Sequence, residues 1–230
     1  MPQTPLSWPD RASIAHGGLF VVLEGGEGAG KSTQSRRLVD RLRATGREVV
    51  ATREPGGSPV SEAVRAVLLD PANEGMSVRA EALLFAAARG EHVARVVAPA
   101  LARGAVVVCD RYVDSSVAYQ GIARGLGADT VAGLSLWATE GLLPDLTVLL
   151  DVDPADGLVR AGDPDRLEAE PLEFHRAVRE GYLRLAATEP DRYLVLDGHD
   201  AVEVVAARID EAVGGLLAAR PAASRAEVTS

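Results

Sequence analysis

Apolar residues gather in short runs along this chain, and longer segments with a helical pattern separate the runs. The runs lie at residues 19–24, 48–53, 105–110, 146–152 and 193–197. The helix-length segments lie at residues 31–45, 59–70, 78–103, 128–141, 168–188 and 201–217. This alternation predicts an α/β fold in which helices cover both faces of a parallel sheet.

Composition indicates one globular domain. The 230 residues are 47% hydrophobic and 25% charged, which leaves enough apolar surface for a single core. Residues 1–17 contain three prolines and no periodicity, and residues 219–230 are rich in alanine, serine and charge, so both ends are expected to be flexible extensions. The folded domain is expected at residues 18–218.

Charge and hydropathy disfavour two classes of partner. The formal net charge of −9 argues against a sequence-independent nucleic-acid binder, because such proteins carry an excess of lysine and arginine. No apolar stretch approaches the ~20 residues needed to span a bilayer, and the N-terminus lacks the basic start and apolar core of a signal peptide. We therefore expect no nucleic-acid or membrane partner, and a cytoplasmic location.

A glycine-rich segment follows the first apolar run and opens a helix-compatible stretch. Residues 25–32 read Gly-Gly-Glu-Gly-Ala-Gly-Lys-Ser, the pattern of a phosphate-binding loop. In such a loop backbone N–H groups converge on phosphate, Lys31 reaches the β- and γ-phosphates, and Ser32 ligates Mg²⁺. The predicted ATP-binding residues are Gly25, Gly26, Glu27, Gly28, Ala29, Gly30, Lys31, Ser32 and Thr33.

A turn follows the second apolar run, at Thr-Arg-Glu-Pro-Gly-Gly, residues 52–57. Its proline and glycines force a reversal that is expected to expose the charged pair Arg53 and Glu54. Ligands of parallel sheets gather at the carboxyl ends of the strands. This turn, the glycine-rich segment and residues 110–121 should therefore share one cleft.

Two further pairs of residues are candidates for acceptor contacts. Phe85 and Arg89 stand four residues apart and so lie on one helix face, where a ring beside a guanidinium could hold a planar base. Taken alone, Phe85 also fits a core position and Arg89 a solvated one. Asp110 and Arg111 end the third run, where a carboxylate can organise Mg²⁺-bound water and an arginine can clamp phosphate.

Four motifs together resemble those of bacterial thymidylate kinases, where they occur in the same order. They are Glu-Gly-Gly-Glu-Gly-Ala-Gly-Lys-Ser-Thr at 24–33, Thr-Arg-Glu-Pro-Gly-Gly at 52–57, Leu-Phe-Ala-Ala-Ala-Arg at 84–89, and Asp-Arg-Tyr-x-x-Ser-Ser-x-Ala-Tyr-Gln-Gly at 110–121. The resemblance implies a P-loop kinase three-layer fold with a five-stranded parallel sheet, flanking helices and a short lid. It also implies transfer of the γ-phosphoryl group of ATP to dTMP, giving dTDP and ADP in dTTP synthesis, with Mg²⁺ and a homodimer.

The same resemblance assigns the acceptor site residue by residue. Thymine is expected on Phe85, with Arg89 at its edge and Ser116 and Gln120 at its border; the sugar is expected beside Tyr119 and Glu27. The acceptor phosphate is expected beside Arg53, Arg65 and Arg111, although Arg65 also fits a solvated helix position. Mg²⁺ is expected at Ser32 and Asp110. The apolar stretch 134–138 is one candidate for a dimer interface, and core packing within the chain is its alternative.

Position 28 is glycine, whereas one subgroup of the family has arginine there. The resemblance therefore implies a catalytic arginine in the lid, expected as a flexible segment at residues 157–171. Arg160 and Arg166 are the candidates, and Arg166 is favoured because it lies in an Asp-Arg-Leu-Glu stretch that matches the family. The predicted catalytic residues are Lys31, Arg111, Arg160 and Arg166. This lid is shorter, with fewer arginines, than is common in the subgroup.

Two other classes of function stay open. One is a P-loop kinase that phosphorylates a different small acceptor, and the other is a P-loop switch or ATPase that controls a partner. A switch would need a water-orienting residue and a partner surface, neither of which is evident, and it leaves Phe85 and Arg89 without a role. ADP release in the presence of different monophosphates distinguishes the three.

Overall fold

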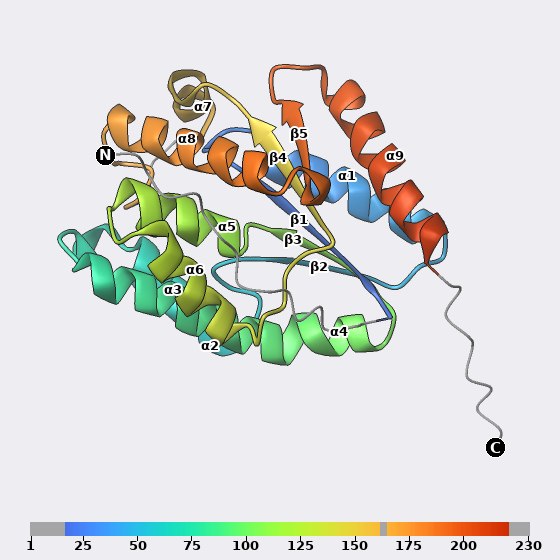
Figure 1. Cartoon of the computed structure of the whole chain (residues 1–230), viewed down its shortest axis with the longest axis horizontal. Helices are drawn as coiled ribbons and strands as arrows, with labels where there is room; N and C mark the ends of the chain where they lie inside the picture. The colour runs from blue at the N-terminus through green and yellow to red at the C-terminus, as the bar shows by residue number, and fades with distance from the viewer. Residues whose placement is uncertain (1–16, 162–164, 221–230) are drawn as a thin grey trace.

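A computed structural model describes residues 17–161 and 165–220. Its five strands form one parallel sheet in the order β2-β3-β1-β4-β5. They are β1 (Leu19–Gly25), β2 (Val49–Arg53), β3 (Val106–Asp110), β4 (Leu146–Asp151) and β5 (Tyr193–Asp197). The predicted P-loop kinase architecture of a five-stranded parallel sheet between helices is confirmed (Figure 1).

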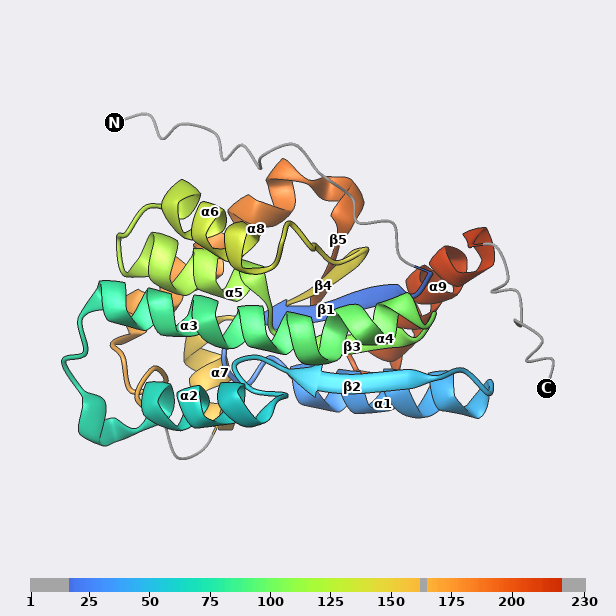
Figure 2. The same ribbon diagram turned by 90° about the horizontal axis from the view of Figure 1, so that it is seen from below.

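Helices lie on both faces of the sheet (Figures 1 and 2). One face carries α1 (Lys31–Ala44) and α9 (Val202–Ala219), and the other carries helices from the middle of the chain. Those are the π-helical turn η2 (Val93–Val97), α4 (Ala98–Ala102), α5 (Val113–Ser116), the π-helical turn η3 (Val117–Ala123), α6 (Ala128–Ala138) and α8 (Leu172–Thr188). The helix α2 (Pro59–Leu69) packs on α3 (Val78–His92), which in turn packs on α6. The 3₁₀ turns η1 (Pro71–Asn73) and η4 (Pro190–Arg192) and the helix α7 (Pro154–Ala161) complete the described elements.

The core has two apolar layers, one on each face of the sheet. Alternate side chains of β1 serve opposite layers: Leu19, Val21 and Leu23 pack under α1 and α9, whereas Phe20 and Val22 pack toward α4, α5 and α6. Because both faces are buried, the strand is apolar at every one of these positions instead of alternating with polar residues.

The strand register brings the predicted site segments together. Leu23 of β1 and Arg53 of β2 both pair with Asp110 of β3, so these three strands end side by side. The loops that leave them therefore meet at one edge of the sheet, as expected for ligand sites of parallel sheets.

Three segments differ from the sequence-based prediction. The helix expected at 78–103 is interrupted by the π-helical turn η2, and residues 113–123 are helical although no helix was predicted there. Residues 157–161, predicted as the flexible start of a lid, belong to α7, because this segment packs against the glycine-rich loop. Residues 162–164 of that lid lie outside the described residues.

The predicted terminal extensions fall mostly outside the described residues, at 1–16 and 221–230. At the C-terminal boundary, α9 continues to Ala219, and Arg220 Nη2 pairs with Asp145 Oδ1 at 2.5 Å. Both Ala219 and Arg220 lie just past position 218, where the domain was predicted to end. In the described part of the chain, no helix is both long enough and apolar enough to cross a membrane.

Candidate active site

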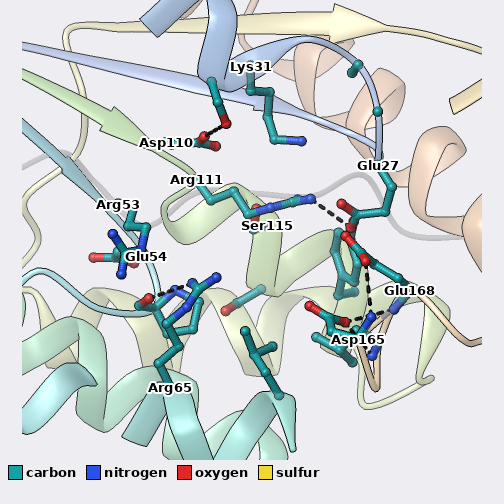
Figure 3. Close-up of a pocket in the computed structure, with 18 of the residues that line it drawn as sticks. Glu27, Lys31, Arg53, Glu54, Arg65, Asp110, Arg111, Ser115, Asp165 and Glu168 are labelled. Atoms are coloured by element: carbon teal, nitrogen blue, oxygen red, sulfur yellow. Dashed lines mark hydrogen bonds and ion pairs between the residues drawn. The ribbon is translucent and has the colours of Figure 1, made fainter. Parts of the chain in front are cut away.

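A cavity of about 510 Å³ opens at the carboxyl edge of the sheet (Figure 3). This volume is typical of small-molecule sites. The predicted site residues that line it are Glu27, Gly28, Ala29, Gly30, Lys31, Ser32, Thr33, Arg53, Arg65, Phe85, Asp110, Arg111, Ser116, Tyr119, Gln120 and Arg160. Four other predicted residues, Gly25, Gly26, Arg89 and Arg166, are not among its lining residues.

Lys31 is the first residue of α1 and folds back over the loop that precedes it. Its Nζ donates to the carbonyl oxygens of Gly25 at 3.0 Å and Gly26 at 2.7 Å. Burial, followed by the nearby charge of Arg111, lowers the pKa of Lys31. A buried ammonium group whose hydrogen bonds go to backbone carbonyls is well placed to gain from a bound phosphate, which would add full negative charge beside it.

Ser32 and Asp110 bring two oxygen ligands to the same point. Ser32 Oγ donates to Asp110 Oδ2 at 2.9 Å, across the junction of α1 with the end of β3. Hydroxyl and carboxylate oxygens are the donors that Mg²⁺ prefers, so this pair fits that ion.

Arg53 and Arg65 line the cavity together with Arg111. Arg53 donates to both carboxylate oxygens of Glu62 at 3.0 Å, and Arg65 donates to the carbonyl oxygen of Pro55 at 2.8 Å. Burial, with a further contribution from the charge of Arg53, lowers the pKa of Arg65. The neighbouring guanidinium groups of Arg53, Arg65 and Arg111 form a site for an anion such as phosphate.

Glu27 ties the loop to the segment after β3. Its Oε1 accepts from Arg111 Nη2 and from the Tyr119 hydroxyl, each at 2.7 Å (Figure 3). Burial alone would raise the pKa of Glu27, but Arg111, Lys31 and Tyr119 together lower it to about 2. The carboxylate is therefore ionised and available to accept from a substrate hydroxyl.

Phe85 lies at the apolar end of the cavity. It is 8% exposed and belongs to a cluster with Leu68 and Leu167, while Ser116 and Gln120 supply polar groups beside it. An aromatic ring with a few polar neighbours is suited to a planar heterocycle.

Arg89 lies beneath this pocket and not in it. It is 2% exposed and donates to Glu54 Oε2 at 2.7 Å and to Ser116 Oγ, Ser135 Oγ and the Tyr112 carbonyl oxygen at 3.0 Å each. Glu54, expected to be exposed on its turn, is instead buried, because Arg89 pairs with its Oε2 at 2.7 Å and His92 Nδ1 lies 2.9 Å from its Oε1. Glu54 lies 35 positions from Arg89 and 38 positions from His92 in the sequence, so no local sequence signal indicated these contacts.

The structure separates the two candidate lid arginines. Arg160 extends from α7, lines the cavity and lies with Nη1 3.5 Å from the Gly198 carbonyl oxygen. Arg166 is buried, donating to the Leu68 carbonyl oxygen at 2.7 Å and pairing with Glu81 Oε2 at 2.7 Å. In this conformation only Arg160 adjoins the phosphate-binding loop.

Gly28 and Gly157 permit the close approach of α7 to the loop. A Cβ atom at Gly28 would lie 2.0 Å from the Gly157 carbonyl oxygen, and one at Gly157 would lie 2.3 Å from the Glu27 carbonyl oxygen. Gly28 also has a φ of +62°, which side chains other than glycine rarely adopt. The helix α7 therefore leaves no room for a side chain at position 28. Arg160 of α7 lies beside this position: a Cβ atom added at Gly28 would be 3.0 Å from the Cβ atom of Arg160.

Glu24, the last polar residue of β1, is a site residue that sequence reasoning missed. It is fully buried and accepts from the Tyr112 N–H at 2.8 Å, the Ser115 hydroxyl at 2.6 Å and the Tyr182 hydroxyl at 2.9 Å. Burial, together with the charge of Asp114, raises its pKa to about 7. The available signals were its position at the end of an apolar strand and its place as the first residue of the motif at residues 24–33.

This raised pKa predicts a pH-dependent stability. The folded state retains a proton that the unfolded state releases above its pKa of 4.5, so the contribution of Glu24 is present at low pH and declines as the pH rises to about 7. Relative to Glu24→Gln, the wild-type free energy of unfolding should fall by about 3 kcal/mol over this range. Denaturant unfolding of both proteins across the range measures it, and parallel curves would contradict it.

Comparison with known proteins places the chain in a family. The family model described as thymidylate kinase matches residues 23–209. The thymidylate kinase of Clavibacter sepedonicus is 53% identical over 206 residues, covering 88% of this chain and 97% of the relative. That of Deinococcus radiodurans is 54% identical over 199 residues, covering 85% and 96%. The crystal structure of thymidylate kinase from Ehrlichia chaffeensis superimposes with a TM-score of 0.72 at 30% identity, covering 86% of this chain and 98% of that one. The cavity, the fold and these relatives agree, and the chain belongs to the thymidylate kinase family.

Proposed function

We propose that this protein transfers the γ-phosphoryl group of ATP to dTMP, giving dTDP and ADP for dTTP synthesis. One observation carries the proposal: a single cavity is lined by the phosphate-binding loop, by the aromatic ring of Phe85, and by the four arginines Arg53, Arg65, Arg111 and Arg160. A plain ATPase would have no use for the aromatic pocket.

The cavity suits the physics of phosphoryl transfer. The transition state is loose and its charge spreads over the transferred oxygens, so catalysis consists of alignment and of positive charge in a dry site. We assign Lys31 and Arg160 to the donor phosphates and Arg111, Arg53 and Arg65 to the acceptor phosphate. Arg111 lies centrally, since its guanidinium contacts both the Gly25 carbonyl oxygen and Glu27.

We assign Ser32 and Asp110 to Mg²⁺, which would neutralise charge on the donor phosphates. Thymine would stack on Phe85, and the sugar would lie between Tyr119 and Glu27, whose ionised carboxylate can accept from a hydroxyl. Arg89 would act on the base edge mainly through Ser116, which it contacts at 3.0 Å. A cytoplasmic location suits these substrates and the free buried thiol of Cys109.

ADP release from ATP in the presence of Mg²⁺ and a panel of nucleoside monophosphates tests the reaction. Strong stimulation by dTMP is expected. Stimulation by a different monophosphate alone would favour another kinase, and turnover independent of the acceptor would favour an ATPase or switch. Omitting the divalent cation should remove the dTMP-dependent rate.

We also propose a homodimer formed through α3 and α6. Core packing does not account for Trp137, which is 82% exposed, or for Leu83, which is 57% exposed. The two lie in one shallow apolar groove together with Ala86, Ala87, Gly90, Leu134, Leu136 and Ala138. Such a patch matches a second copy of itself across a two-fold axis.

Trp137→Glu is therefore expected to convert a dimer into a monomer, because the carboxylate would be desolvated at the centre of the interface. Sedimentation velocity of both proteins measures this. Val195→Glu is the control, since Val195 is an exposed apolar residue on β5, away from α3 and α6. A wild-type protein that sediments as a monomer at micromolar concentration would contradict the proposal.

A further inference from the structure

Glu81 has no place in the mechanism above, yet it is one of the most highly connected carboxylates of the molecule. It lies in the first turn of α3 and is 1% exposed. Its Oε1 accepts from Gln120 Nε2 at 2.9 Å, and its Oε2 pairs with Arg166 Nη1 at 2.7 Å. Arg124 makes two longer contacts, at 3.3 Å to each oxygen, and also pairs with Glu170 at 2.7 Å.

These contacts determine how the Gln120 amide is oriented. Gln120 Nε2 donates to Glu81 Oε1, and Glu81 also accepts from two arginines, so the NH₂ group of Gln120 faces Glu81. The amide carbonyl oxygen then points away from Glu81. Gln120 and Phe85 line the same cavity, so this oxygen is the polar atom that Gln120 has left for a ligand there.

We propose that Glu81 is a positioning residue that determines base selectivity: by orienting the Gln120 amide, it makes the base pocket present a hydrogen-bond acceptor. This inference rests on the proposed function. An acceptor suits thymine and uracil, whose N3 carries a hydrogen. It disfavours cytosine, whose N3 is itself an acceptor, because two facing acceptors leave both unsatisfied in a buried site.

The geometry predicts what Glu81→Gln would do. Arg166 requires an oxygen at the Oε2 position, where its contact of 2.7 Å is the shortest that Glu81 makes. The new NH₂ group must therefore take the Oε1 position and face Gln120. Gln120 would then turn its carbonyl oxygen toward position 81 and its NH₂ group toward the base, so the pocket would present a donor.

The experiment compares kcat/KM for dTMP, dUMP and dCMP in the wild type and in Glu81→Gln. The dTMP-to-dCMP ratio should fall by at least roughly fivefold, the scale of one neutral hydrogen bond. The dTMP-to-dUMP ratio should stay near the wild-type value, because these two bases share the N3 hydrogen. A purely structural role would lower all three rates in parallel, and that result would overturn the proposal.

Glu170→Gln is the matched control. It removes the same charge from the same cluster, through Arg124, but leaves the contact between Glu81 and Gln120 untouched. Its selectivity should equal that of the wild type. An equal loss of selectivity in this variant would mean that the charge of the cluster, and not the Gln120 amide, is responsible.

Gln120→Leu keeps the inference testable even where Glu81→Gln is poorly folded. It should lower kcat/KM for dTMP and dUMP more than for dCMP. In that background Glu81→Gln should produce no further change in selectivity, since the amide through which it acts is gone. Unchanged selectivity in folded Gln120→Leu would overturn the inference. Failure of wild-type protein to use dTMP would instead contradict the proposed function.

Discussion

Lys31→Ala is expected to slow phosphoryl transfer by about 10²–10³-fold, the scale for loss of one preorganised charge from a transition state. The fold should survive, because the Lys31 ammonium contacts only the carbonyl oxygens of its own loop. One of these, that of Gly25, also accepts from Arg111 at 3.2 Å and so stays satisfied. What the variant loses is the positive charge of Lys31 beside the donor phosphates.

Single-turnover measurements with saturating ATP and dTMP, together with thermal unfolding, test this expectation. Arg37→Ala is the control, since Arg37 is a surface cation on the same helix and pairs with Glu203 at 3.0 Å. A near-normal rate in folded Lys31→Ala would remove the loop from the mechanism. A general loss of stability would mean that the lysine supports the fold.

Arg160→Ala should reduce the rate at saturation by up to about 10³-fold, the scale of arginines that act on a transferred phosphoryl group. Gly28 supplies no side chain, and α7 places Arg160 against the loop at that position. Ground-state binding of dTMP should change little, because Arg160 lies on the α7 side of the cavity, away from Phe85. The effect should appear in kcat and not in KM for dTMP.

Arg166→Ala provides the contrast. Its guanidinium is bound to Glu81 and to the Leu68 carbonyl oxygen, so its removal should lower thermal stability and weaken acceptor binding more than it slows chemistry. The comparison uses single-turnover rates of both variants at saturating substrates. If Arg160→Ala and Arg166→Ala slowed the chemical step equally, the assignment of Arg160 would be contradicted. If neither variant slowed it, Arg111 would have to supply the positive charge beside the transferred phosphoryl group.

The strands and the P-loop could be read from the sequence because they depend on local patterns. Each predicted strand lies within one residue of its observed bounds, since short apolar runs between helix-length segments have few other stable arrangements in a parallel sheet. The family and the activity, inferred from four spaced motifs, are confirmed by the family model and by relatives that cover almost the whole domain.

Helices that begin next to the site were harder to predict. Residues 113–123 contain serines, a tyrosine and glycine, which read as a polar loop, yet they are helical because Glu24 accepts from Tyr112 and Ser115 at their start. Residues 157–161 read as flexible for their glycine, whereas Gly157 is the residue that lets α7 contact the loop. Both outcomes depend on partners more than 80 positions away in the chain.

By itself, the sequence determined the chemistry of this protein: a phosphate loop, an aromatic for a base, and arginines at the ends of neighbouring strands. Spacing and residue type suffice for these, because each is encoded within one short segment. Only the tertiary structure decided which charges face the cavity. Arg89 and Arg166 are buried with partners from other elements, Glu54 is buried against Arg89 in the cavity wall, and Arg160 faces the loop. Burying a charge is costly unless a partner compensates it, and that partner is known only once the chain has folded.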